Sequence, residues 1–296
     1  MERITINAMA KVNLGLDVLR RREDGYHEVN MVMQTVKLYD TLVLEAKEEE
    51  GITVRVDVGD IPTDENNLIA RAARILYQHY PITKGVEITL TKRIPIAAGM
   101  AGGSTDAAAT LVGMNHLFEL GLNEERLKEL GVRIGADVPY CIQGGTVLSQ
   151  GIGEKLTVLP KAPDCFLVIA KPDLFISTKE VYEKLDAAAL KWHPNIDAMV
   201  ESIKQQDLTE IAANMGNVLE TVTEREYPII SQLKQLLKEE GALNALMSGS
   251  GPTVFGIFSD EQKARKALEE VRRKKLALQS FVTGLSPNAQ VILEST

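Results

Sequence analysis

The chain has 296 residues, of which 45% are hydrophobic and 25% charged, a composition typical of a globular protein with a sizeable core. Its net charge of -8 argues against a nucleic-acid binder that relies on phosphate neutralisation. No apolar run approaches the roughly 18 residues of a membrane span, and residues 1–7 lack a signal-peptide pattern. Cys141 and Cys165 have no metal-ligand spacing and favour a reducing compartment, so we expect a cytoplasmic location.

Residues 3–19 alternate between apolar and polar side chains, which predicts strand structure. Lys11 and Asn13 lie two positions apart and therefore share one face of the strand. A lysine in such a position is most often a solvated charge. Apolar neighbours on the same face would make it an unusual place for an unpaired ammonium, and we expect these neighbours to be Ala8, Ala10, Leu14 and Leu16.

A hairpin turn follows at Asp24-Gly25, between two strand-like segments. Tyr26 and His27 come directly after the turn, where they could pack against the sheet or face a ligand. Further strands are expected over residues 38–45, 52–58 and 86–91. A helix is expected to begin after residues 62–67, so Asn66 and Asn67 could cap it or contact a nucleotide.

The segment 92–109 is a glycine-rich loop between the strand at 86–91 and a helical pattern. Ser104 is the predicted N-cap of that helix. A glycine-rich turn that leads into a helix N-terminus gathers free N–H groups and can hold a phosphate, with Ser104 and Thr105 placed to help hold a phosphate-bound Mg2+. The alternative is a tight turn that merely needs small residues. No Walker motif and no dinucleotide fingerprint is present.

The segment 135–141 places Asp137 before Val138-Pro139, so Asp137 could be a plain N-cap of a short helix or an exposed functional carboxylate. A hairpin is expected over residues 143–159, and the Pro-rich segment 160–164 is the best domain boundary. A buried strand at 166–170, helices over residues 196–240 and strands near Phe281 and Val291 predict a small α+β sandwich in the second half.

Three segments together resemble the GHMP small-molecule kinases, a family named for galactokinase, homoserine kinase, mevalonate kinase and phosphomevalonate kinase. Residues 95–105 are similar to the family's phosphate loop, with Met100 and Ala101 in place of the commoner leucine and glycine. Residues 10–16 and 247–253 are similar to its first and third motifs. The segments 24–27 and 135–140 resemble, more narrowly, the branch that acts on 4-diphosphocytidyl-2-C-methyl-D-erythritol.

This resemblance implies an α+β fold of two domains. Residues 1–160 would form a ribosomal-protein-S5-domain-2-like domain that binds ATP and substrate, and residues 161–296 a ferredoxin-like domain. The implied reaction is ATP-dependent phosphorylation of the 2-hydroxyl of 4-diphosphocytidyl-2-C-methyl-D-erythritol in the non-mevalonate isoprenoid pathway, with Mg2+. We expect a monomer or homodimer with no nucleic-acid or membrane partner. The alternatives are a kinase of another small alcohol and a catalytically silent nucleotide-binding protein.

The resemblance also assigns roles to residues. Asp137 would take the proton from the substrate hydroxyl, and Lys11 would pair with it and balance charge on the transferred phosphoryl group. The metal site would be left to Ser104, Thr105 and the phosphates, with Asp137 as a further candidate ligand. The implied ATP-binding residues are Asn66, Pro95, Ile96, Ala97, Ala98, Gly99, Met100, Ala101, Gly102, Gly103, Ser104 and Thr105. The implied substrate-binding residues are Asn13, Tyr26, His27, Thr178, Tyr182, Ser248, Gly249, Ser250 and Gly251, with Tyr26 stacked on the cytosine, His27 bonded to its polar edge, and Tyr182 a second aromatic.

Overall fold

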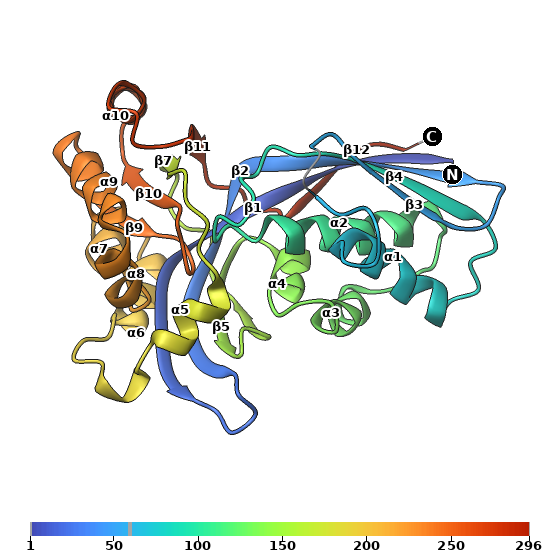
Figure 1. Ribbon diagram of the computed structural model, residues 1–296, viewed down its shortest axis with the longest axis horizontal. Coiled ribbons are helices and arrows are strands. Elements are labelled where there is room, and N and C mark those ends of the chain that lie inside the picture. The colour runs from blue at the N-terminus through green and yellow to red at the C-terminus, as the bar shows by residue number, and fades with distance from the viewer. Residues whose placement is uncertain (1, 59–60, 296) are drawn as a thin grey trace.

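The structure is a computed structural model that describes residues 2–58 and 61–295. The larger of its two sheets is organised around β1 (Arg3–Arg21) and β2 (His27–Lys47), which pair antiparallel along most of their length (Figure 1). In the described residues, six more strands join this sheet: β3 (Ile52–Val56), β4 (Gly85–Thr91), β5 (Thr146–Gly151), β6 (Lys155–Val158), β8 (Gly216–Asn217) and β12 (Gln290–Ser295). The predicted hairpins at residues 24–25 and 143–159 are confirmed.

Helices cover one face of this sheet (Figure 1); they are α1 (Leu68–His79), α2 (Gly102–Leu117), α3 (Glu124–Val132) and α4 (Val138–Gln143). The first begins where the sequence predicts, because the Asn67 side chain accepts a hydrogen bond from the Ile69 N–H and caps the helix. Small residues on α2, such as Ala107 and Ala108, are fully buried and let this helix lie close to α1 and to the sheet. The glycine loop and Asp137 are therefore held at the ends of packed helices.

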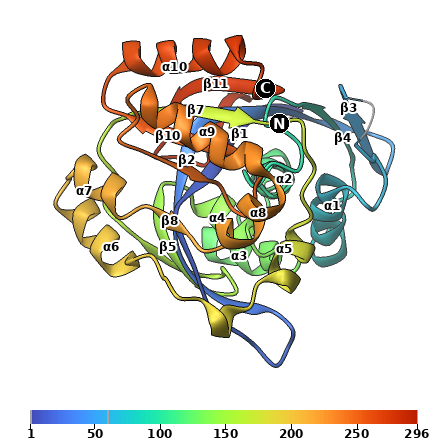
Figure 2. The same ribbon diagram turned by 60° about the vertical axis from the view of Figure 1, so that its left-hand side comes forward.

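The second sheet has four strands in the described residues, β7 (Phe166–Lys171), β9 (Asn244–Met247), β10 (Val254–Phe258) and β11 (Gln279–Gly284). Their antiparallel order, β11-β7-β10-β9, with helices in both crossovers, gives the ferredoxin-like arrangement that the sequence predicts. The remaining helical elements are α5 (Thr178–Lys184), η1 (Ala187–Ala189), α6 (Ile196–Lys204), α7 (Leu208–Ala213), α8 (Glu220–Glu226), α9 (Pro228–Glu239) and α10 (Glu261–Arg273). Figure 2 shows α9 and α10 lying against the outer side of this sheet.

The two halves share a buried interface. Val12 and Val36, on the face of β1 and β2 away from α2, belong to the same apolar cluster as Ile169 and Phe255 of the second sheet. All four are fully buried. This close-packed core joins the two halves, and the loops at the edge of the interface are therefore attached to a rigid base.

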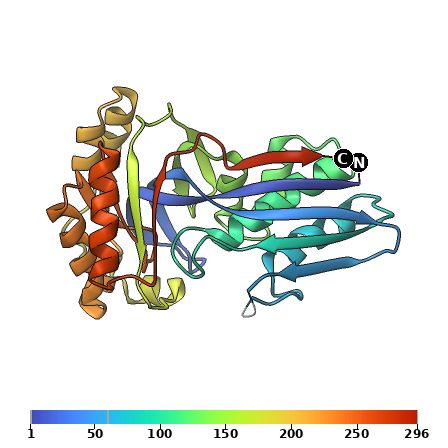
Figure 3. The same ribbon diagram turned by 90° about the horizontal axis from the view of Figure 1, so that it is seen from above.

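The last strand departs from the sequence-based expectation. The strand predicted near Val291 exists as β12, but it pairs with β1 in the first sheet and does not complete the second sandwich. The first and last described strands lie side by side in Figure 3. The predicted boundary segment, residues 160–164, connects β6 of the first sheet to β7 of the second. The chain then returns to the first sheet at residues 290–295.

Candidate active site

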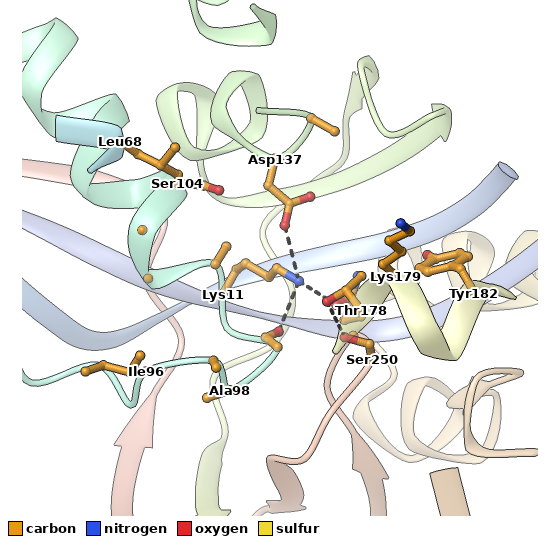
Figure 4. Close-up of a pocket in the computed structure, with 18 of the residues that line it drawn as sticks. Lys11, Leu68, Ile96, Ala98, Ser104, Asp137, Thr178, Lys179, Tyr182 and Ser250 are labelled. Atoms are coloured by element: carbon orange, nitrogen blue, oxygen red, sulfur yellow. Dashed lines mark hydrogen bonds and ion pairs between the residues drawn. The ribbon is translucent and has the colours of Figure 1, made fainter. Parts of the chain in front are cut away.

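A cavity of about 970 Å³ opens where the two halves meet. Figure 4 shows its walls: the glycine loop and the start of α2, the middle of β1, the turn before α4, the beginning of α5 and the loop between β9 and β10. Elements from both halves thus contribute side chains to one concave surface, as is usual for small-molecule sites.

Bulges in β1 aim Lys11 and Asn13 into this cavity. The register with β2 shifts between Met9 and Lys11, and again between Asn13 and Gly15. Ala10 and Leu14, the residues at these shifts, point into the cluster between the halves, whereas Ala8 and Leu16 point toward the helices. The expectation that all four apolar residues share a face with Lys11 is therefore wrong. Bulges commonly re-aim a side chain in this way next to a functional site.

The Lys11 ammonium is buried and held by fixed acceptors. It donates to Asn13 Oδ1 at 2.8 Å and to the Gly99 carbonyl at 3.2 Å, and it lies 3.8 Å from Asp137 Oδ2 (Figure 4). Lys11 is only 5% exposed, so a solvated surface charge is excluded. Asn13 and Gly99 thus fix the position of the ammonium, which faces the cavity and lies next to Asp137.

Asp137 occupies the N-cap position of α4, yet its side chain makes no capping hydrogen bond. The plain-cap interpretation is therefore wrong. A third of the carboxylate side chain is exposed, and it lines the cavity opposite the glycine loop. Its arrangement leaves an oxygen free to approach a substrate hydroxyl, which is the first requirement for a general base.

The glycine loop ends in a helix N-terminus that faces the same space. The N-cap of α2 is Ala101, in the left-handed conformation at φ 58°, and Ser104 lies inside the first turn, so the prediction of Ser104 as N-cap is wrong. The first i to i−4 bond of the helix runs from Thr105 N–H to the Ala101 carbonyl. The N–H groups of Gly102, Gly103 and Ser104 precede it and are available to an anion.

Gly99 joins the glycine loop to the loop between β9 and β10. Its φ is +69°, and a Cβ there would collide with the carbonyl oxygen of Ser248. The Gly99 carbonyl in turn accepts hydrogen bonds from Lys11 Nζ and, at 2.9 Å, from Ser248 Oγ. Only glycine permits this close approach, which ties the two halves together at the base of the cavity.

Aromatic residues line the other end of the cavity. The rings of His27 and Tyr182 lie 5.1 Å apart between centroids and are tilted by 41°. Tyr26 is 58% exposed at the hairpin turn, so its ring is free to cover a ligand. Burial, with a smaller contribution from Arg21, lowers the pKa of His27 and favours a neutral imidazole. Thr178 and Ser250 also line the cavity, and a 2.7 Å hydrogen bond joins their hydroxyls.

The structure brings most of the predicted site residues to this cavity. Those that line it are Lys11, Asn13, Tyr26, His27, Asn66, Pro95, Ile96, Ala97, Ala98, Gly99, Ala101, Gly102, Gly103, Ser104, Asp137, Thr178, Tyr182, Gly249 and Ser250. Met100 does not, because its side chain is buried in the core. Thr105 is also fully buried, and its hydroxyl donates to the Met9 carbonyl. Ser248 and Gly251 shape the supporting loop behind Gly249 and Ser250.

Among the residues that the structure describes, five charged ones that the sequence-based assignment did not include line the cavity: Arg21, Lys92, Asp106, Lys179 and Glu183. Lys92 and Asp106 flank the glycine loop, and their side chains form a 2.7 Å ion pair beneath it. Their position at the two ends of the motif was visible in the sequence, but their contact was not. Lys179, on α5, also reaches the cavity rim (Figure 4).

Comparison with known proteins identifies the family of the chain. Residues 67–145 match the GHMP kinases N terminal domain, and residues 199–277 match the GHMP kinases C terminal domain. The 4-diphosphocytidyl-2-C-methyl-D-erythritol kinase of Lachnospira eligens is 53% identical over 283 residues, covering 96% of this chain and 98% of the relative. That of Clostridioides difficile is 49% identical over 275 residues, covering 93% of each chain.

Solved structures of kinases also resemble this chain. A crystal structure of 4-(cytidine 5'-diphospho)-2C-methyl-D-erythritol kinase, 32% identical, superposes with a TM-score of 0.82 over 95% of this chain and 99% of that chain. Homoserine kinase from Cytophaga hutchinsonii, 21% identical, shares the fold with a TM-score of 0.80 over 99% of this chain and 98% of that chain. The chain belongs to the GHMP kinase family, among the 4-diphosphocytidyl-2-C-methyl-D-erythritol kinases.

Proposed function

We propose that this chain transfers the γ-phosphoryl group of ATP to the 2-hydroxyl of 4-diphosphocytidyl-2-C-methyl-D-erythritol, in the non-mevalonate route to isoprenoid precursors. The observation that carries the proposal is the Lys11–Asp137 pair, which lies across the cavity from the free N–H groups at the start of α2. A hydroxyl placed between them would meet a carboxylate on one side and a bound phosphate on the other.

Each residue then has a chemical task. Asp137 Oδ accepts the proton of the substrate hydroxyl as the oxygen attacks phosphorus. Lys11, fixed by Asn13 and Gly99, holds Asp137 and faces the charge that develops on the transferred group. The N–H groups of Gly102, Gly103 and Ser104 bind the phosphates and need no reorganisation, because the helix already orients them.

The open space in front of Gly103 fits a phosphate. A Cβ added there would meet only Leu68 Cδ1, at 3.4 Å, so the protein leaves the position in front of the loop free. The described residues hold no group of three or more His, Cys, Asp or Glu side chains that could bind a metal alone. A magnesium ion bound mainly by phosphates suits such a site, with Ser104 as the hydroxyl ligand. When bound, MgATP supplies the phosphoryl group and the neutralising charge.

The aromatic end of the cavity suits a cytosine. Tyr26, His27 and Tyr182 offer a stacking surface and a neutral imidazole edge. Asn66 and the α1 side of the glycine loop line the opposite end, where we place the adenosine of ATP. The two nucleotides would therefore approach from opposite ends, with the reacting groups between them.

A coupled ADP-release assay tests the proposal. The purified chain is given MgATP with the cytidyl substrate, and in separate reactions with homoserine, mevalonate, galactose and 2-C-methyl-D-erythritol 4-phosphate. We expect turnover with the cytidyl substrate alone. Turnover of another alcohol would favour the second kinase hypothesis, and ATP binding without turnover on any alcohol would favour a silent nucleotide-binding protein.

The cellular location and the oligomeric state of the enzyme are also proposals. Both cysteines are free and buried, which suits a reducing cytoplasm. No helix within residues 2–58 and 61–295 is long and apolar enough to cross a bilayer. We expect a monomer or homodimer, which light scattering of the purified chain would distinguish.

A further inference from the structure

The glycine loop stands on a buried cluster of three charged side chains. The Lys92 ammonium pairs with Asp40 of β2 and, at 2.7 Å, with Asp106 of α2. Asp40 is fully buried, and the side chains of Lys92 and Asp106 are only 6% and 4% exposed. Lys92 precedes the loop and Asp106 follows it, so this contact closes the loop across its base.

Asp40 fastens the entry to the loop a second time. Its Oδ1 accepts hydrogen bonds from the backbone N–H groups of Arg93, at 2.6 Å, and Ile94, at 2.8 Å. One carboxylate on the neighbouring strand thus orders the first residues of the loop. The same carboxylate pairs with the Lys92 ammonium, which also contacts Asp106 just after the loop.

Stability alone does not account for this cluster. Desolvating charges is costly, and buried ion pairs are often no better for stability than apolar residues of the same size. Asp106 Oδ1 has no hydrogen-bond partner among the described residues, which adds to the cost. Burial acts to lower the pKa of Lys92, but the two carboxylates outweigh it and raise that pKa, so the lysine stays charged.

The ammonium lies directly behind the phosphate-facing backbone. A Cβ added to Gly102 would come within 2.9 Å of Lys92 Nζ. Because Gly102 begins α2 and offers one of its free N–H groups, a shift of the ammonium would move the backbone that faces the phosphate. The position of the charged cluster therefore fixes the position of the free N–H groups at the start of α2.

We propose that Lys92, clamped between Asp40 and Asp106, is a positioning residue that holds the glycine loop in its ATP-binding conformation before ATP arrives. The inference rests on the proposed function, since it takes the loop to be the triphosphate site. Without the clamp, the loop must be ordered when ATP binds, and that entropic cost appears as weaker ATP affinity. The aromatic end of the cavity does not touch the cluster, so affinity for a cytidine nucleotide stays unchanged.

The test compares Lys92→Met with Lys234→Met. Lys234 is a matched control, because its ammonium also pairs with two carboxylates, those of Glu220 and Glu224, but it does not line the cavity. Calorimetry with a non-hydrolysable ATP analogue and Mg2+, and separately with CDP, gives the two affinities. We expect Lys92→Met to weaken the ATP analogue at least tenfold and CDP less than twofold, and Lys234→Met to change neither.

Two further variants separate positioning from folding. Asp106→Asn keeps an oxygen for the Lys92 ammonium and should retain ATP-analogue affinity within threefold, whereas Asp106→Ala should lose it as Lys92→Met does. Hydrogen exchange of the ligand-free protein should show faster exchange of loop amides 99–104 in Lys92→Met than in Lys234→Met. Unchanged exchange and unchanged ATP affinity in a folded Lys92→Met protein would overturn the inference. Failure of the wild type to bind the ATP analogue would instead overturn the proposed function, and the exchange result would still decide the clamp.

Discussion

The Lys11 ammonium lies 3.8 Å from the Asp137 carboxylate, although one residue is in the middle of a strand and the other precedes a helix. Lys11 is nearly buried, whereas a third of the Asp137 side chain is exposed. The lysine is therefore the fixed member of the pair, and the carboxylate is the member that a substrate can reach.

Replacing Asp137 with Asn should abolish most turnover and leave both affinities nearly intact. Loss of a general base costs about 10²–10⁴ in rate, and the amide keeps the size and hydrogen-bonding capacity of the side chain. Single-turnover kinetics measure the rate, and calorimetry measures ATP and substrate affinity. Asp173→Asn, at an exposed position outside the cavity, is the matched control. Wild-type kcat in Asp137→Asn would contradict the assigned mechanism.

Removing the Asn13 side chain should impair the reaction through Lys11. Asn13 Oδ1 accepts the shortest hydrogen bond of the ammonium, and a hydrogen bond to a charged group contributes about 1.5–3 kcal/mol. We expect Asn13→Ala to lower kcat about tenfold to a hundredfold. In a double-mutant cycle, adding Asn13→Ala to Lys11→Met should cost little more, because the group it positions is gone. Additive losses would mean that Asn13 acts on the substrate directly.

The glycines of the loop should divide into two classes. Gly103→Val combined with Ser104→Ala should weaken ATP binding strongly while the apo protein stays folded, since the position in front of Gly103 is open. Gly99→Ala should instead lower the melting temperature, because its Cβ would collide with Ser248 and its φ is positive. Differential scanning fluorimetry and calorimetry separate these outcomes. Unchanged nucleotide affinity in the Gly103 double variant would remove the loop from the phosphate site.

Methylerythritol phosphate, which lacks the cytidyl group, should be a very poor substrate. Contacts to the base lie far from the chemistry, so their loss should lower kcat as well as raise KM. His27→Ala and Tyr26→Ala should each lower kcat/KM for the cytidyl substrate about tenfold to a hundredfold, since stacking or a hydrogen bond contributes about 1–3 kcal/mol. Neither variant should improve the truncated substrate. Equal kcat/KM for the two substrates in the wild type would reject the cytidyl assignment.

Acid should destabilise the protein partly through His27. Burial, followed by Arg21, lowers the pKa of His27 in the folded state, so the unfolded chain takes up a proton first as the pH falls below about 6.5. Stability is therefore retained above that pH and declines below it. Melting temperatures of wild type and His27→Gln at pH 5.5 and 7.5 test this. The melting temperature of the wild type should fall more between pH 7.5 and pH 5.5 than that of His27→Gln. Equal falls would show that His27 contributes nothing to the pH dependence of stability.

The sequence located the residues that line the cavity better than it predicted how the fold holds them. Lys11, Asp137 and the glycine loop could be found because their neighbours form recognisable local motifs. The bulges around Lys11 could not, because strict alternation places Ala8 and Leu16 on the face opposite Lys11, and the register shifts that change their face depend on the partner strand. Met100 and Thr105 were included because they belong to the motif, although both side chains are buried, Met100 just before α2 and Thr105 in its first turn.

Long-range contacts account for the other differences. Lys92, Asp40 and Asp106 are unremarkable charges in the sequence, and only the fold brings them together. Ser104 was a reasonable N-cap by residue type, but the left-handed Ala101 starts the helix earlier. The α+β character of the second half followed from its order of elements, and its ferredoxin-like fold from the family resemblance. The destination of the last strand did not, because pairing between residues nearly 300 apart leaves no local pattern.

The return of β12 to β1 has a consequence for synthesis of the protein. The edge of the first sheet beside residues 4–8 is covered only when residues 290–295 have left the ribosome. Until then, an open strand edge stays available for mispairing, so the nascent chain depends on late closure or on a chaperone. A stop codon before residue 290 should therefore yield an aggregation-prone polypeptide, even though every residue of the cavity has already been translated.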